Sequence, residues 1–351
     1  MNQTVFVNHS LSEHAHFSID VSIVIVNYNG AKFLEKLFSS LSIQTFSNFE
    51  VIFVDNHSQD NSLEVLEKTL AVKSIQNLRI KIFKNKENLG YCRGNNIGLS
   101  SSDGTYVVFL NNDTYVSETW LEELVNVMNA DSMIGACQSR LIQPDNGCVQ
   151  NDGHVLDFFG WSQSIVVESA DVMVSDAPVF VSGASFIARK NDLVRIGGFD
   201  GELFLGDYDL CWRLRLLGYK MAVALRSICY HYGGSTMVNS TLASQIKTAY
   251  HYEKERPRVL LKVYSKGHLI KRAPVLVALM NLETISTSLK FKNPLFILGF
   301  AKALGWNLKE IQSTLLARFK VQRSRLINDR DIERKMPHYI ILLTRQLVVK
   351  K

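Results

Sequence analysis

Three short polar turns follow apolar runs in the first third of the chain: Asn27–Gly30, Asp55–Ser58 and Asn111–Asp113. A carboxylate such as Asp55 can accept hydrogen bonds from the N–H or hydroxyl groups of a nucleoside. A carboxylate flanked by amides, as Asp113 is, can hold Mg²⁺ or Mn²⁺ through oxygen while a diphosphate completes the coordination. The competing interpretation is that these residues only cap helices or close turns.

Two further carboxylates, Asp207 and Asp209, stand in the first turn of a predicted helix. One of them could act as a general base toward an incoming hydroxyl, and repulsion between the two can raise one pKa toward neutrality. Because helix N-termini favour anions, capping is again the alternative. His231 precedes Gly233 and Gly234, and these flexible neighbours favour contact with a metal or a phosphate over a structural role.

The apolar patterns that must position these residues alternate between strands and helices. Buried strands are predicted at 21–26, 49–54, 78–83 and 106–110, each followed by a turn and by helical spacing. Repeated units of this kind predict an α/β fold with an open parallel sheet and helices on both faces. Since ligands bind at the carboxyl ends of strands in such sheets, we expect the three polar turns to converge on one rim.

The rest of the chain is less regular. Ile134–Asp176 is Gly-rich with weak alternation, and we expect an irregular acceptor-side region there. Val179–Ala188 is predicted as a strand interrupted by Gly183, followed by a helix at 205–217 and a strand at 219–224. The tail is predicted to be mostly helical, with helices at 245–264, 274–289, 294–303 and 308–321.

Charge divides the chain unevenly. Residues 1–240 carry 17 Lys and Arg against 26 Asp and Glu, whereas residues 241–351 carry 22 against 7. We expect a poorly ordered start at 1–18, an α/β domain at 19–240 and a basic, mainly helical region at 241–351. The basic, partly apolar tail fits an anionic membrane surface or a nucleic acid, or it packs on the domain with a solvated face. Without a signal segment or an apolar run of about 18 residues, we expect a cytoplasmic protein, at most peripheral on a membrane face.

Six motifs stand in a fixed order along the first 240 residues: SIVIVNYNG (Ser22–Gly30), SLSIQTFSNFEVIFVDNHSQDNS (Ser40–Ser62), NLGYCRGNNIGL (Asn88–Leu99), YVVFLNNDT (Tyr106–Thr114), GGFDGELFLGDYDLCWRLRLLGYK (Gly197–Lys220) and YHYGGST (Tyr230–Thr236). Together they resemble the family 2 glycosyltransferases of the GT-A fold, particularly the branch that contains rhamnosyl- and galactofuranosyl-transferases. The tail is similar, more weakly, to the basic helical extension of that family.

The resemblance implies transfer of a sugar, with inversion, from a nucleotide-diphosphate donor to a hydroxyl of a glycan or lipid-linked acceptor. It favours dTDP-rhamnose or a UDP-hexose as donor, Mg²⁺ or Mn²⁺ as cofactor, and a place in cell-surface polysaccharide or glycoconjugate synthesis. Asp113 would be the principal metal ligand, with His231 completing the site. Asp207 would be the catalytic base, with Asp209 next in line.

The same resemblance assigns the remaining candidate residues by position. The acceptor side would be formed by Gly183, Trp212 and Arg213. The donor nucleotide would be bound by Asn27, Asn29, Asp55, Asn88, Gly90, Arg93, Asn95, Asn96, Asn111 and Asn112.

Two positions depart from the family pattern. Asn111 replaces the first carboxylate of the Asp-x-Asp motif, and Gly206 stands where most relatives carry Glu. The second departure leaves open a catalytically impaired protein that binds a sugar nucleotide without transferring it. A third hypothesis, a nucleic-acid-binding protein using the basic tail, lacks any recognised RNA- or DNA-binding module, so we expect no nucleic acid partner. The sequence does not indicate an oligomeric state.

Overall fold

The computed structural model describes residues 5–8, 19–73, 75, 78–168, 171–175, 179–233, 241–337 and 340–342. The expectation of a poorly ordered start falls largely outside these ranges. Within it, Val5–Asn8 forms strand β1, which pairs antiparallel with β4 (Ile80–Lys84) at the edge of the main sheet.

Four parallel strands form the first half of the main sheet. Their order is β4, β3 (Phe49–Asp55), β2 (Val21–Asn27) and β5 (Tyr106–Leu110). Both faces of β2, β3 and β5 are buried, which explains their mostly apolar sequences, whereas β4, with Lys81 and Lys84, is only partly buried. The parallel pairing places their carboxyl ends at one edge, where the polar turns follow.

The second half of the sheet is mixed, so the predicted parallel arrangement describes the first half. β13 (Ser185–Arg189) runs antiparallel between β5 and β7 (Ile134–Ile142), and β14 (Lys220–His231) returns parallel to β7. β11 (Val172–Ser175) forms the far edge. The short strands β6 (Thr114–Val116) and β8 (Val149–Asn151) pair with β14 and β7. A separate small sheet contains β10 (Ser162–Ser164), β9 (His154–Leu156) and β12 (Val179–Phe180).

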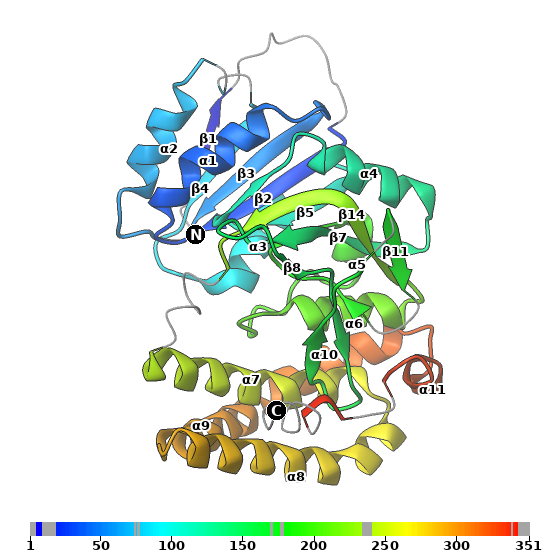
Figure 1. Cartoon of the computed structure of the whole chain (residues 1–351). Helices are drawn as coiled ribbons and strands as arrows, with labels where there is room; N and C mark the ends of the chain where they lie inside the picture. Colours follow the sequence, from blue (N-terminus) through cyan, green and yellow to red (C-terminus); the bar gives the residue numbers. More distant parts are fainter. Residues whose placement is uncertain are drawn as a thin grey trace.

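Helices cover both faces of the sheet, so the predicted fold class is confirmed (Figure 1). One core lies under α1 (Ala31–Ser42), α2 (Ser62–Leu70) and α4 (Trp120–Ala130). The other core lies under α3 (Gly90–Ser101), α6 (Asp207–Leu216) and the C-terminal helices, with α5 (Lys190–Arg195) beside them. Alternate residues of β2 divide between the two, Ile23 and Ile25 in the first and Val24 in the second.

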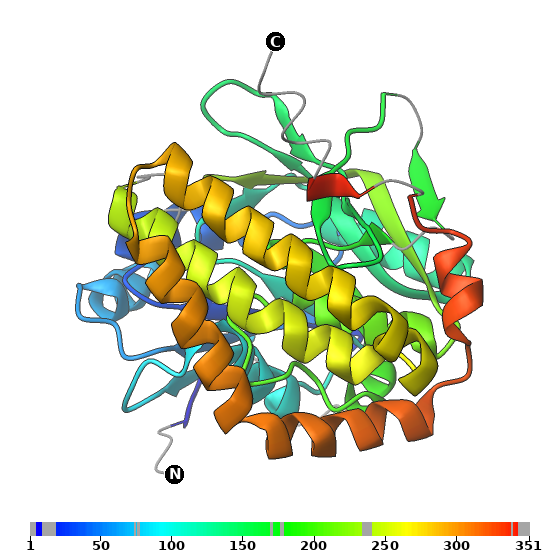
Figure 2. The same ribbon diagram turned by 90° about the horizontal axis from the view of Figure 1, so that it is seen from below.

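The C-terminal extension is a layer of helices, which Figure 2 shows from below. Its first helix packs on α6, where Trp212 meets Tyr264 edge to face with ring centroids 5.4 Å apart. No helix in the described ranges combines the length and apolar character needed to span a membrane. The helices are α7 (Leu242–Val263), α8 (Lys266–Lys290), α9 (Leu295–Lys309), α10 (Ile311–Ser324) and α11 (Asp329–Glu333).

Three predicted elements differ from the structure. The predicted strand 179–188 splits at Gly183 into β12 and β13, which belong to different sheets. The region expected to be irregular begins with the nine-residue strand β7. Helix α8 begins at Lys266, eight residues before Pro274, because Leu269 and Leu276 on either side of the proline pack on one core and hold the helix through it.

Candidate active site

A buried hydrogen-bond network joins the three polar turns at the carboxyl ends of β2, β3 and β5. Asn27 and Asp55 are paired in register on neighbouring strands, and both are buried. The Asn27 amide donates to Asp55 Oδ1 at 3.2 Å and to Ser58 Oγ at 3.0 Å. The Asn112 amide donates to Asn27 Oδ1 at 2.8 Å. The structure therefore brings Asn27, Asp55 and Asn112 together at one rim.

Gly30 leaves the space in which the side chains of Asn27 and Asn112 meet. A Cβ atom at Gly30 would lie 2.2 Å from Asn112 Nδ2 and 2.3 Å from Asn27 Oδ1, so a larger residue would push the two amides apart. Asn29 lies beside the network in a left-handed conformation, and its Oδ1 accepts from the backbone N–H of Gln59 at 2.7 Å. Asp55 also accepts from the Ser58 hydroxyl at 2.6 Å and the Ser58 N–H at 3.1 Å. Both carboxylate oxygens of the buried Asp55 therefore close the turn at Ser58, which is the structural role that the sequence left open.

Asp113 and His231 face each other across two different chain segments. Asp113 precedes β6 and His231 ends β14, and antiparallel pairing of these strands brings His231 Nε2 within 3.4 Å of Asp113 Oδ1. The other ring nitrogen, Nδ1, lies 2.8 Å from Gln150 Oε1. With Nδ1 donating to that oxygen, the Nε2 lone pair faces the carboxylate, which is the arrangement that a shared cation would stabilise.

The donor set at this pair fits a divalent metal only in part. Carboxylate and imidazole are suitable ligands, but the described residues contain no group of three His, Cys, Asp or Glu side chains that could hold a metal. Two protein ligands match a site that substrate oxygens must complete. Asn111 adds no further carboxylate; its backbone N–H donates to the Ala184 carbonyl, and its carbonyl accepts from the Thr114 hydroxyl.

The residues between Asn88 and Asn96 that were predicted to bind the donor make different kinds of contact. Asn88 Oδ1 accepts from Gly90 N at 2.9 Å and shapes the first turn of the helix. Arg93 instead forms an ion pair with Glu202 at 2.6 Å. Two asparagines also make structural contacts: Asn95 donates to the Tyr91 carbonyl, and Asn96 bonds both the N–H and the carbonyl of Phe199. Arg93, Asn95 and Asn96 thus fix α3 and the loop at 199–202, rather than joining the Asn27 network.

Asp207 begins α6 beside Gly183. Asp207 Oδ2 accepts from Gly183 N at 3.0 Å, and Tyr91 donates its hydroxyl proton to the Gly183 carbonyl at 2.9 Å. A Cβ atom at Gly183 would lie 2.5 Å from the Tyr91 hydroxyl, so glycine permits this contact. Burial raises the pKa of Asp207 to about 6, although the N–H groups of Gly183 and Tyr208 act in the opposite direction. A carboxyl with this pKa exchanges its proton close to neutral pH.

The alternative base, Asp209, is in a different environment. It is fully buried, 2.8 Å from Arg213 Nη2 and 2.6 Å from Lys262 Nζ of α7. Trp212 is buried against Tyr264. We therefore correct three predictions: Asp209, Trp212 and Arg213 lie in the interface between α6 and α7, where an acceptor cannot reach them.

Gly206, the departure from the family pattern, fits its surroundings closely. Its φ angle is +71°, and a Cβ atom there would lie 2.4 Å from Cys92 Sγ. A glutamate has no room at this position in this structure. The left-handed backbone and the nearby Cys92 side chain both favour glycine at this position.

Three residues near these groups were not predicted. Tyr91 lies in the motif 88–99, Gln150 orients His231, and Glu255 of α7 accepts hydrogen bonds from the backbone N–H groups of Phe204 and Leu205, just before Asp207. Burial raises the pKa of Glu255 to about 7. No local pattern marks Gln150 or Glu255, because their partners are far away in sequence.

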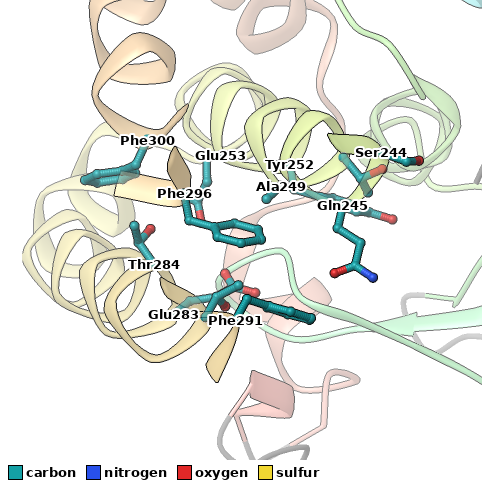
Figure 3. Close-up of a pocket in the computed structure, with 12 residues that line it drawn as sticks. Ser244, Gln245, Ala249, Tyr252, Glu253, Glu283, Thr284, Phe291, Phe296 and Phe300 are labelled. Atoms are coloured by element: carbon teal, nitrogen blue, oxygen red, sulfur yellow. The ribbon is translucent and has the colours of Figure 1, made fainter. Parts of the chain in front are cut away.

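A cavity of about 450 Å³ lies elsewhere, between α7, α8 and α9 (Figure 3). Its walls include Phe291, Phe296 and Phe300, with Glu253 and Thr284 among the polar lining. None of the predicted site residues lines this cavity. We place the chemistry at the rim, since the carboxylates, amides and imidazole are gathered there.

Two family models match this chain, and their ranges share residues 106–162, which include the turn Asn111–Asp113. "Glycosyl transferase family 2" matches residues 22–162, and "Glycosyl transferase family group 2" matches residues 106–273. Together the two models cover residues 22–273, and over this range the chain matches the family 2 glycosyltransferases. The matches do not distinguish the rhamnosyltransferase branch from others.

Individual curated proteins are similar to this chain over part of their length. A cholesterol galactosyltransferase of Borreliella burgdorferi is 36% identical over 117 residues, 33% of this chain and 31% of that protein. A poly-beta-1,6-N-acetyl-D-glucosamine synthase of Staphylococcus aureus is 22% identical over 282 residues, 77% of this chain and 64% of that protein. The chain thus spans about a third to two thirds of the length of these curated relatives.

Solved structures show the fold. A mannosyltransferase from Pyrobaculum calidifontis, in complex with GDP-Man and Mn²⁺, has a TM-score of 0.54 at 17% identity, covering 96% of this chain and 89% of its own. GalNAc-T7 with UDP, GalNAc and Mn²⁺ has a TM-score of 0.53 at 17% identity, covering 82% of this chain and 62% of its own. The GT-A fold expected for a family 2 glycosyltransferase is confirmed.

Proposed function

We propose that this protein is an inverting glycosyltransferase that moves a sugar from a nucleotide-diphosphate donor to a hydroxyl group. The observation that carries the proposal is Asp207, a partly exposed carboxylate with a pKa near 6 beside the backbone of Gly183. It belongs to the same sheet edge as the Asn27 network and the pair Asp113–His231. The donor is dTDP-rhamnose or a UDP-hexose, and the acceptor is a glycan or a lipid-linked glycan of cell-surface polysaccharide synthesis.

Each group has one task in the proposed reaction. Asp55, with Asn27 and Asn112, binds the nucleoside and the adjoining phosphate of the donor. Asp207 accepts the proton of the acceptor hydroxyl. The hydroxyl oxygen attacks the anomeric carbon from the face opposite the diphosphate, and the nucleotide diphosphate leaves. Attack from that face inverts the anomeric centre, and alignment of the two reactants supplies much of the acceleration.

Asp113 and His231 are the residues that would hold Mg²⁺ or Mn²⁺. A bound divalent cation neutralises the charge of the departing nucleotide diphosphate. With His231 Nδ1 donating to Gln150 Oε1, the other ring nitrogen would face Asp113 as a ligand. The two structural neighbours solved with Mn²⁺ and a nucleotide or nucleotide sugar support this assignment of a cofactor class.

A thermal-shift panel of UDP-, GDP- and dTDP-sugars, each with Mn²⁺, Mg²⁺ or a chelator, tests donor and metal together. We expect one nucleotide class to raise the melting temperature only when a divalent cation is present, because ligands that bind the folded state stabilise it. Asp113→Asn should abolish the metal-dependent part. The matched control is Asp103→Asn, an exposed carboxylate that pairs with Lys81 ahead of β5.

Transfer of radiolabelled sugar from the stabilising donor to a glycan acceptor then decides between catalysis and binding alone. Stabilisation by a donor with no transfer or hydrolysis would favour the impaired protein suggested by Gly206. Absence of any shift across the panel would contradict the proposed function itself.

A further inference from the structure

Exposed apolar side chains are concentrated on the C-terminal helices. Among the described residues, 17 large apolar side chains between Ile270 and Leu326 are exposed, against eight in the much longer stretch 19–233. A scatter of single exposed apolar residues is normal, but a dense group indicates a surface that contacts another partner.

The exposed residues form an outward stripe on each of three helices. On α10, Ile311, Leu315 and Phe319 recur every four residues, and the inward side chain of Thr314 is buried between them. Helices α8 and α9 show the same division between a buried side and an exposed apolar side. The exposed apolar residues of α8 and α9 are Ile270, Val275, Val277, Leu282, Ile285, Leu289, Leu295, Ile297, Leu298, Leu304 and Leu308.

The charge on these helices is almost entirely positive. Between Lys266 and Arg325 there are 11 Lys and Arg and only two carboxylates, Glu283 and Glu310. Both carboxylates are occupied: Glu283 accepts from Trp161 and from Arg256, and Glu310 accepts from Ser313. In the described part of the chain, nine of the 11 have no carboxylate partner: Lys266, Lys271, Lys290, Lys292, Lys302, Lys309, Arg318, Lys320 and Arg323.

We propose that the outward face of α8, α9 and α10 docks on a membrane surface rich in anionic phospholipid. The apolar stripes enter the boundary between headgroups and acyl chains, and the exposed lysines and Arg323 contact lipid phosphates, whereas Arg318 is bonded inward to the Leu261 and Tyr264 carbonyls. The helices lie in the plane of the surface, since none in the described ranges could cross a bilayer. Figure 2 shows them, gold to orange, spread over one side of the molecule.

Docking on this face brings the active site close to lipid. Helix α7 contacts the layer on one side, where Arg258 donates to Thr314 of α10 and Asn307 of α9 donates to the Lys254 carbonyl. On its other side, Glu255 holds the loop before Asp207. One helix therefore separates Asp207 from the docking face, a geometry suited to an acceptor anchored in the membrane.

Flotation of the full chain with vesicles tests the proposal, and it needs neither donor nor transfer. We expect flotation with vesicles of equal parts phosphatidylcholine and phosphatidylglycerol, none with phosphatidylcholine alone, and weaker binding at high salt. The double variant Leu308→Ser, Leu316→Ser replaces two side chains that are 74% and 67% exposed and should bind at least about tenfold more weakly. Lys302→Glu with Lys309→Glu should weaken binding by about the same factor.

Matched controls lie outside the docking face. Val194→Ser replaces a side chain that is 59% exposed on α5, and Lys73→Glu reverses an exposed charge after α2; both should bind like the unaltered protein. Failure of the full chain to float with anionic vesicles would overturn the proposal. Formation of dimers that the Leu308 and Leu316 substitutions abolish, without vesicle binding, would overturn it in favour of a second copy of the chain.

Discussion

Two carboxylates on α6, only two residues apart, lie in opposite environments. Asp207 is partly exposed, accepts hydrogen bonds from backbone N–H groups and has no cationic partner within the ranges described. Asp209 is fully buried between Arg213 and Lys262. In the proposed reaction the first exchanges a proton with the acceptor, whereas the second stabilises the contact between α6 and α7.

Helix geometry explains the difference. Residues two apart on an α-helix point about 200° away from each other, so one carboxylate faces Gly183 and the other faces α7. The chemistry of each carboxylate is therefore determined by the groups packed against it, and not by its residue type or its place in the helix turn. Four predictions test this contrast between Asp207 and Asp209.

Asp207→Asn should have the largest effect on function. It keeps the shape of the side chain but removes the base, so transfer should fall by about 10² to 10⁴-fold while donor affinity stays nearly the same. Stability at pH 7 should not fall, because the raised pKa of Asp207 means that folding disfavours its charged form. Steady-state kinetics, donor titration and thermal unfolding measure the three quantities. Full activity would remove Asp207 from the mechanism.

Asp209→Asn should act on the fold instead. Removing the charge leaves Arg213 and Lys262 buried with a partner lost, which should lower the free energy of unfolding by about 3–5 kcal/mol. Asp331→Asn, at a half-exposed carboxylate 3.7 Å from Arg334, should change it by less than about 1 kcal/mol. Urea unfolding of the two variants compares them. A stable but inactive Asp209→Asn protein would show that we have assigned the two carboxylates wrongly.

Gly206→Ala, immediately before Asp207, should cost about 1–3 kcal/mol of stability through its left-handed backbone, with an added clash against Cys92. The comparison is Gly197→Ala, where φ is +81° and nothing lies within 4 Å of the added Cβ atom. The difference between the two variants measures the Cys92 contact. Equal losses in both would mean that the clash relaxes without cost.

The pH dependence of transfer should show the smallest change. Since Asp207 must be deprotonated to act as base, activity should rise about tenfold between pH 5 and pH 7, with its midpoint near pH 6. The slope should vanish from the residual activity of Asp207→Asn. A profile of the unaltered enzyme that is flat across this range would exclude a base with this pKa.

Local patterns predicted the strands of the first half and the turns after them, because continuous apolar runs and polar turn residues are local signals. Strand direction is not local: nothing within 185–189 indicates that β13 runs antiparallel between β5 and β7. The misassigned Asp209 illustrates the same limit in the site. Its partner Lys262 is 53 residues away, so the buried ion pair could not be anticipated from the first turn of α6.

The hydrogen bonds from Phe204 and Leu205 to Glu255 have a practical consequence for anyone who shortens this enzyme. A chain ending before α7 would leave those two N–H groups without their acceptor and would also strip Lys262 from Asp209. Such a fragment should be destabilised whether or not the outer helices bind lipid. The outer helices should therefore be tested by surface substitutions in the full chain and not by truncation.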